Sequence, residues 1–210
     1  MTPMKNIAEI LVSNNIVKTN FADPFKWTSG ILSPIYCDCR ELISLPEARD
    51  IITAEFLKII KENDLAHDII SGTATAGIPW ASFVADQLKA PMIYVRGKPK
   101  GHGAGKMVEG RAENGKNILV VEDAISTAGS SIKSADALRS ECEAIVTDIL
   151  AIFTWSTPLS VENAKNANLN IWALTNFHEI ADCLLEQGKI SKEEKNELIK
   201  FNQNPSDWKK

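Results

Sequence analysis

Short apolar runs alternate along this chain with longer segments in which apolar residues recur every three or four positions. The short runs are typical of buried strands, and the periodic segments are typical of amphipathic helices. The runs predict strands at 67–70, 91–95, 118–121, 144–153 and 171–174. The periodicity predicts helices over 4–17 and 46–60, and further helices that begin near residues 79, 132, 176 and 191. This alternation predicts an α/β fold with a doubly wound, mostly parallel sheet.

Capping signals predict where several helices begin and end. Three places have the capping-box spacing, in which an oxygen-bearing cap is followed three residues later by a glutamate. They are Ser44 with Glu47, Asn176 with Glu179, and Ser191 with Glu194. Gly188 is expected to end the helix between the last two. Residues 35–40 alternate weakly between apolar and polar side chains, which suggests an extended segment.

The stretch from residue 118 to residue 131, ILVVEDAISTAGSS, holds the densest candidate chemistry. Two acids, Glu122 and Asp123, follow the apolar strand, and a run of small and hydroxyl-bearing residues follows at 126–131. Backbone N–H groups at the start of a helix attract anions, and small residues let a phosphate approach closely. The two acids repel phosphate and therefore suit hydroxyl groups or a metal ion. The stretch fits a ligand with both a phosphate and a ribose diol.

An ordinary connection between a strand and a helix is the alternative for this stretch. Its serines and threonine would then serve only to cap the helix N-terminus. The other loops of the chain provide the evidence that distinguishes the two interpretations.

Two further loops follow predicted strands. Residues 72–77 are small and can offer backbone N–H groups to an anion, although glycine and alanine also permit tight packing of a helix on a strand. Residues 96–106 contain four glycines, three lysines, an arginine and a histidine. A glycine-rich cationic loop suits closure over a polyanion, because closure excludes water and strengthens each charge contact. The alternative is a solvated charged loop.

Composition limits the class of protein. The 210 residues, with 44% hydrophobic and 24% charged side chains, predict one globular domain over residues 1–210. The net charge of −4 gives no reason to expect a nucleic-acid partner. No signal peptide and no apolar run of about 20 residues is present, so no membrane partner is expected. The four cysteines are too scattered for a zinc knuckle, and reduced thiols in a cytoplasmic protein are expected.

Four motifs, taken in order, resemble those of a known family. The segment VVEDAISTAGSS resembles the 5-phosphoribosyl-1-diphosphate (PRPP) binding motif of type I phosphoribosyltransferases. An aromatic residue followed by Ser-Gly, Ser-Pro, Tyr, Asp and Arg, over residues 25–40, resembles the N-terminal signature of orotate phosphoribosyltransferases. The small-residue loop at 72–77 corresponds to the family's pyrophosphate loop, and its Gly77 is followed by Ile-Pro as in the orotate branch. The order Arg-x-x-x-Lys-x-His-Gly from Arg96 resembles the catalytic loop of that branch.

The resemblance implies a fold, a reaction and a set of site residues. It implies a type I phosphoribosyltransferase fold with a small N-terminal hood over roughly 1–40 and a mobile catalytic flap over roughly 96–114. It implies transfer from PRPP to orotate in pyrimidine synthesis, by a homodimer in which the flap acts in trans. Mg²⁺ would be held mainly by PRPP, with no metal-binding residues in the chain. Catalytic roles fall on Lys100, His102 and Asp123, and orotate contacts on Ile35, Tyr36 and Ser126. PRPP contacts fall on Arg96, Lys100, His102, Glu122, Asp123, Ala124, Ile125, Ser126, Thr127, Ala128, Gly129 and Ser130.

This chain departs from common family patterns in three places. Thr75-Ala76 stands where some members have Tyr-Lys, Gly97 stands where many have Lys, and Thr154 stands near where some have an Arg for the orotate carboxylate. Lys98 is a candidate substitute for the lysine missing at Gly97.

Three other functions compete with the orotate assignment. A phosphoribosyltransferase for another nucleobase would keep the PRPP motif and differ in the hood. A non-catalytic PRPP-sensing regulator would lack the cationic flap and carry a nucleic-acid surface. A nucleotide-binding oxidoreductase would need Gly-x-Gly-x-x-Gly after a first strand, which the chain lacks.

Overall fold

A six-stranded central sheet organises the part of the chain that the computed structural model describes, residues 6–26, 30–99 and 105–208. The strands lie in the order β10-β9-β8-β5-β6-β7, and all neighbours are parallel except the pair β6–β7. Their bounds are β5 (Ile69–Thr73), β6 (Met92–Val95), β7 (Val108–Glu109), β8 (Ile118–Ile125), β9 (Asp148–Thr154) and β10 (Asn170–Asn176). The predicted doubly wound α/β class is confirmed.

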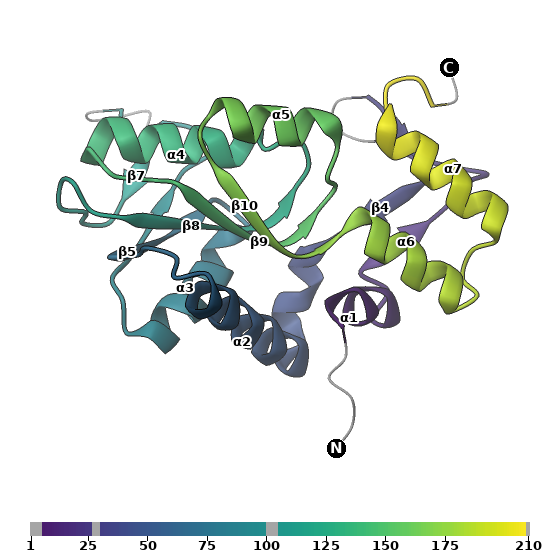
Figure 1. Ribbon diagram of the computed structural model, residues 1–210, viewed down its shortest axis with the longest axis horizontal. Helices are drawn as coiled ribbons and strands as arrows, with labels where there is room; N and C mark the ends of the chain where they lie inside the picture. The colour runs from purple at the N-terminus through teal and green to yellow at the C-terminus, as the bar shows by residue number, and fades with distance from the viewer. Residues whose placement is uncertain (1–5, 27–29, 100–104, 209–210) are drawn as a thin grey trace.

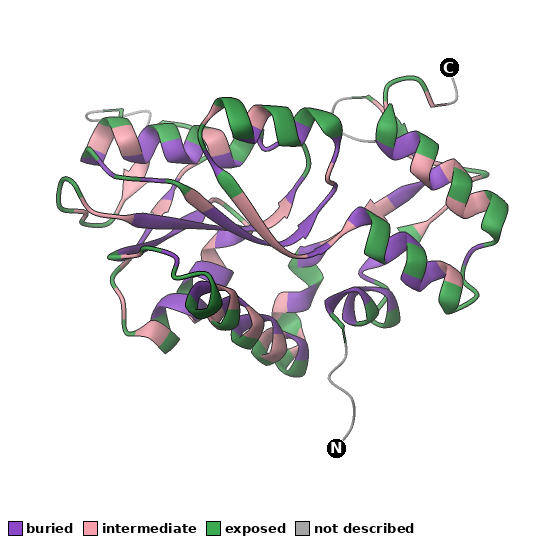
Figure 2. Ribbon diagram, viewed as in Figure 1, coloured by how far each residue is buried: buried purple, intermediate pink, exposed green. Residues whose placement is uncertain are grey.

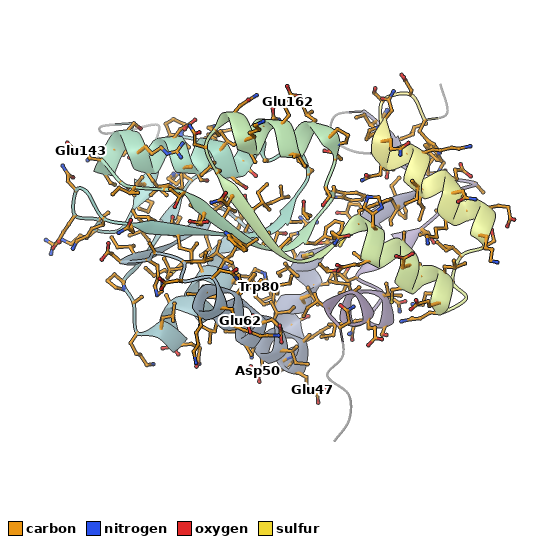
Figure 3. All side chains as sticks on the ribbon, viewed as in Figure 1. Glu47, Asp50, Glu62, Trp80, Glu143 and Glu162 are labelled. Carbon is orange, nitrogen blue, oxygen red and sulfur yellow. The ribbon has the colours of Figure 1, made fainter. Side chains whose placement is uncertain are left out.

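Helices cover both faces of this sheet (Figure 1). One face carries α2 (Pro46–Glu62) and α3 (Gly77–Leu88), and the other carries α4 (Gly129–Cys142) and α5 (Pro158–Asn166). Figure 3 shows the division within the lower layer, where Trp80 points inward and Glu47 and Asp50 point outward. Trp80 is fully buried, whereas both acids are exposed.

Strand β8 lies inside the molecule with both faces covered, so its sequence is a continuous apolar run rather than an alternating one. Leu119 and Val121 belong to the apolar core shared with α2 and α3, and Ile118 and Val120 belong to the core shared with α4. Figure 2 shows this strand buried along most of its length. Successive side chains point to opposite faces, so any polar residue at the end of β8 faces one of two different layers.

The two ends of the chain build a second layer beside the sheet, visible on the right of Figure 1. Its N-terminal part comprises α1 (Ile7–Ser13), β1 (Val17–Thr19), β2 (Phe25–Lys26), β3 (Leu32–Ser33), β4 (Ile35–Cys37) and the 3₁₀ helix η1 (Cys39–Ser44). Strands β1–β4 and β2–β3 form antiparallel pairs. Helices α6 (Phe177–Glu186) and α7 (Lys192–Gln203) complete it, and Lys189 Nζ donates to the Val12 carbonyl at 2.6 Å. The hood-like layer therefore uses C-terminal residues as well as the predicted N-terminal ones.

Several predicted boundaries are confirmed. Strands form at the five predicted places, and Ser191 with Glu194 makes a full capping box at the start of α7. Asn176 accepts the N–H groups of His178 and Glu179 at the start of α6. Gly188 follows the end of α6 with a φ of 65°, a conformation that glycine adopts without steric cost.

Other boundaries are wrong for identifiable reasons. The predicted capping box at Ser44 is absent, because Ser44 belongs to η1 and donates its hydroxyl to the Glu41 carbonyl. The first helix is shorter than 4–17 and is capped by Asn6 and Asn14. The strand predicted over 144–153 begins only at Asp148, and residue 145 makes an isolated bridge.

Two further elements differ from the sequence prediction. The extended segment predicted for 35–40 ends at Cys37, where the chain turns into η1. Helix α5 was not predicted, although Thr157 caps it by accepting the Ser160 N–H and Pro158 occupies its first turn.

The strand order reverses between β5 and β8, since the chain winds outward from β5 to β6 and then from β8 to β10. In open α/β sheets, ligands bind at the carboxyl ends of the strands beside such a reversal. In the described ranges, no helix is long and apolar enough to span a membrane.

Candidate active site

The acidic pair, Glu122 and Asp123, lies within the last four residues of strand β8 rather than after the strand. The strand continues four residues past the predicted end because it pairs in parallel with β9, Glu122 opposite Ala151 and Ala124 opposite Phe153. Strand alternation sends Glu122 and Asp123 to opposite faces of the sheet. The two acids therefore have different surroundings.

Glu122 faces α4 and is only 4% exposed. Its Oε1 accepts hydrogen bonds from the hydroxyls of Ser130 at 2.9 Å and Ser131 at 3.2 Å. Burial raises the pKa of Glu122 to about 7, the neighbouring Asp123 charge adds to that rise, and the serine hydroxyls oppose it. In the structure this carboxyl group therefore accepts its hydrogen bonds from the first turn of α4.

Asp123 faces the hood-like layer and is half-buried. Burial raises the pKa of its carboxyl group, and Asp38 adds to the rise, whereas the Arg40 guanidinium opposes it. Arg40 itself donates to both Asp38 carboxylate oxygens at 2.6 Å and to the Tyr36 hydroxyl at 3.1 Å. Residues of β4 and η1 thus lie beside the acid predicted to be catalytic.

The connection from β8 to α4 presents an uncapped helix N-terminus. Helix α4 begins at Gly129, three residues before the predicted start, and its N-cap is Ala128 in the left-handed conformation with a φ of 64°. Among the described residues, no side chain caps this terminus, because the N-cap residue is an alanine. Ser130 and Ser131 lie inside the first turn and donate their hydroxyls to Glu122. The capping role that the alternative interpretation gave these hydroxyls is not seen at the start of α4. The first-turn N–H groups are left for an anion.

Helix α5 fixes the orientation of this connection. Thr157 Oγ1 donates to the Ser126 carbonyl at 3.3 Å, and Asn163 Nδ2 donates to the Thr127 carbonyl at 2.9 Å. In a trans peptide group the N–H points opposite to the C=O, so the amides that follow these carbonyls point away from α5. Sequence reasoning missed Thr157 and Asn163, and the only local signal was the cap preceding Pro158.

The loop after β5 packs directly on β8. A Cβ atom at Gly77 would lie 2.4 Å from the Val121 carbonyl oxygen, and one at Gly72 would lie 2.8 Å from the Ile78 Cα. Both glycines are therefore required for close packing of α3. Thr73 Oγ1 also donates to Ser134 Oγ at 3.0 Å, which ties β5 to α4. The predicted anion contact of this loop stays a prediction.

The base of the flap is anchored to α4. Glu141 accepts the N–H groups of Met107 at 2.8 Å and Val108 at 3.1 Å, and Lys133 Nζ donates to the Gly97 carbonyl at 2.9 Å. Arg96 pairs with Glu109 across β6 and β7 at 3.3 Å. Lys100 and His102 lie outside the described residues. Among the predicted flap residues, the structure thus places Arg96 at the carboxyl end of β6.

The predicted orotate contacts come from two layers. Ser126 is exposed at the end of β8, and Tyr36 is half-buried on β4 with its ring 5.6 Å from that of Phe25. Ile35 is only 1% exposed and belongs to the core, so it offers no accessible surface to a ligand in this structure. These roles remain predictions.

Comparisons with known proteins agree with this arrangement. The phosphoribosyl transferase domain family matches residues 41–152, which include the β5 loop, the flap and the β8–α4 connection. The chain is 44% identical over 208 residues to the orotate phosphoribosyltransferase of Coxiella burnetii, covering 99% of each chain. The chain belongs to the orotate phosphoribosyltransferase family. Another member, from Cytophaga hutchinsonii, is 39% identical over 210 residues and is covered completely.

A solved member of the orotate phosphoribosyltransferase family has the same fold. The crystal structure of the Aeropyrum pernix protein is 26% identical, with a TM-score of 0.75, and the match covers 88% of this chain and 99% of that one. Thr154 is buried at the end of β9, and its hydroxyl accepts the Ser156 N–H at 3.1 Å. Within the described ranges, no group of three His, Cys, Asp or Glu residues could hold a metal ion.

Proposed function

We propose that this chain transfers the ribose 5-phosphate group of PRPP to orotate, which gives orotidine 5′-phosphate and pyrophosphate in pyrimidine biosynthesis. The observation that carries the proposal is the uncapped N-terminus of α4 directly beyond the acidic end of β8. Membership of the orotate phosphoribosyltransferase family supplies the base.

The parts of PRPP match the three loops in turn. The 5′-phosphate suits the N–H groups at 126–130, and the ribose diol suits the acidic end of β8, where Asp123 is the more accessible acid. The pyrophosphate suits the β5 loop together with Arg96, Lys100 and His102. Orotate would lie between Ser126 and the hood, beside Tyr36.

The chemistry asks mainly for electrostatic stabilisation. Cleavage of the bond from C1′ to pyrophosphate develops positive charge on the ribose and negative charge on the leaving group. Cations of the flap would stabilise the leaving pyrophosphate, and Asp123 would hold the ribose in line with the attacking orotate nitrogen. Closure of the flap would exclude water from this step.

We propose that Mg²⁺ enters with PRPP rather than in a protein cage. The described residues offer no cluster of three ligands, which fits a cation held by pyrophosphate and ribose oxygens. When bound, Mg²⁺ would neutralise part of the pyrophosphate charge.

A base panel tests the proposal. Purified protein with PRPP and Mg²⁺ should convert orotate and leave uracil, adenine and hypoxanthine unchanged. Conversion of another base in preference to orotate would show that the base assignment is wrong, and no conversion of any base would favour a sensing role.

We also propose a homodimer in which each flap serves the partner's site. Mixing Lys100→Ala and Asp123→Ala chains should restore up to about a quarter of wild-type activity, because the mixed dimer keeps one intact site. A verified mixed dimer without activity would place the flap and the acid in one chain.

A cytoplasmic location is part of the same proposal. All four cysteines are free thiols, which supports a reducing compartment. Cell fractionation should recover the protein with other cytoplasmic enzymes, and recovery from an oxidising compartment would contradict this location.

A further inference from the structure

The buried carboxyl group of Glu122 has an unusual position for an anion site. It is 4% exposed, and its Oε1 holds the hydroxyls of Ser130 and Ser131, both in the first turn of α4. The same turn offers the backbone N–H groups proposed to bind the 5′-phosphate. A carboxylate therefore sits directly beneath the place where a dianion is expected to bind.

The groups that surround Glu122 do not neutralise it. Strand β9 presents Ala151 opposite, α3 presents the Gly77 backbone, and β5 presents the Thr73 hydroxyl. Asp123, on the same strand, is the charged neighbour that acts most strongly on Glu122, and its charge has the same sign. Lys133 of α4 donates to the Gly97 carbonyl, and in the described ranges Glu122 makes no ion pair.

We propose that Glu122 is a positioning residue beneath the phosphate loop, and that it takes up one proton from solvent when an anion binds at the start of α4. The inference rests on the proposed role of this loop as the 5′-phosphate site. It extends that role because binding of the anion and protonation of Glu122 would occur together.

The physical reason is repulsion between like charges at short range in a water-poor site. A bound dianion disfavours the ionised form of a buried carboxyl group, and burial has already brought the pKa of Glu122 to about 7. A small further rise then protonates the group at neutral pH. The new proton would lie on the second carboxyl oxygen, while Oε1 keeps both serine hydroxyls.

Sulfate separates this role from a contact with the ribose diol. It stays a dianion throughout the neutral range and carries no ribose. If Glu122 acts beneath the anion, its charge affects sulfate binding; if Glu122 only holds the ribose hydroxyls, sulfate binding is indifferent to it.

The test is calorimetric titration of the intact protein with sulfate, in paired buffers of different ionisation enthalpy. Wild-type affinity should fall up to about tenfold between about pH 6 and about pH 8, with uptake of at most about half a proton per sulfate near pH 7 and closer to one near pH 8. Glu122→Gln keeps an oxygen for both serine hydroxyls and is permanently neutral. It should bind sulfate with no slope in this range and, near pH 8, up to about tenfold more tightly than wild type.

Two control variants protect the interpretation. His102→Gln removes the flap histidine proposed to contact PRPP, and the slope should survive it. Ser131→Ala removes a hydroxyl that lowers the pKa of Glu122, so the midpoint of the slope should move to higher pH.

Several results would overturn the inference. They are a flat wild-type profile, a Glu122→Gln variant that keeps the wild-type slope, or a variant that binds sulfate normally but loses ribose 5-phosphate. Absence of sulfate binding by wild type would remove the phosphate site itself. Failure of the base panel alone would leave the inference standing, because no nucleobase is present in this titration.

Discussion

The proposed phosphate end of the site and the predicted hood are built in different ways. The phosphate end rests on β8, a strand buried on both faces, and its polar contacts join residues far apart in sequence, such as Thr73 with Ser134 and Asn163 with Thr127. The predicted hood rests on strands of two or three residues, and the side-chain contacts around Tyr36 are local, such as Arg40 with Asp38. The difference suggests that the proposed PRPP-binding part of the site is held by the packing of the central sheet. The proposed orotate-binding part depends on a few side chains that could be replaced without loss of the fold.

The largest expected difference in stability between the two regions is at Gly77. A methyl group there meets the Val121 carbonyl oxygen at 2.4 Å, so the backbone of β8 or α3 must shift to admit it. Gly77→Ala should lower the free energy of unfolding by about 4 kcal/mol. Gly97→Ala is the matched control, because no atom of the described residues lies within 4 Å of its added Cβ, and stability should be unchanged. Equal urea midpoints for the two variants would refute tight packing at β8.

The second largest effect is expected at Asp123. Asp123→Ala should lower kcat/KM for PRPP about 100-fold or more, because the ribose loses an oriented carboxylate. Tyr36→Phe, on the hood, removes only a hydroxyl that accepts from Arg40 and should raise KM for orotate about threefold. Steady-state kinetics with each substrate varied would measure both, and a larger loss in Tyr36→Phe would reverse the comparison.

Glu122 should make stability depend on pH. Burial raises its pKa from an ordinary 4.5 to about 7, so the folded state holds the proton where the unfolded state has lost it. Its contribution is therefore complete below about pH 4.5, declines as pH rises towards 7, and is constant above. Glu122→Gln should gain about 3 kcal/mol relative to wild type between these limits. Urea unfolding across this range would measure the gain, and a pH-independent difference would contradict it.

The smallest effect is expected at Arg40. Its ion pair with Asp38 is exposed on the Arg40 side, where the side chain is 61% accessible. Arg40→Gln should cost no more than about 0.5 kcal/mol of stability in urea unfolding, since solvent screens such pairs. A loss as large as that at Gly77 would mean that the hood is as constrained as β8.

Local sequence was sufficient for the elements whose signals are local. The apolar run before Glu122 gave strand β8, and Ser191 with Glu194 gave the start of α7. The motif order predicted the family, which the relatives confirm, whereas the place of the phosphate loop stays a prediction. Each of these rests on residues within a few positions of one another.

Long-range partners were beyond the sequence. Strand β8 extends to Ile125 because β9 pairs with it. Helix α4 begins directly after Ala128, whose left-handed backbone conformation is uncommon for alanine and is not predictable from the local sequence. The serines looked like caps, and only the placement of α4 against β8 shows that they serve Glu122. Ser44 does not cap α2 because it is the last residue of η1.

The central claim is that this chain moves ribose 5-phosphate from PRPP to orotate. The most direct test incubates the purified protein with orotate, PRPP and Mg²⁺ and identifies the products by mass spectrometry, with Asp123→Ala as the matched blank. Orotidine 5′-phosphate and pyrophosphate should form in equal amounts with wild type and at least about 100-fold more slowly with the variant. Intact orotate after PRPP is consumed, or equal rates in the two proteins, would contradict the account.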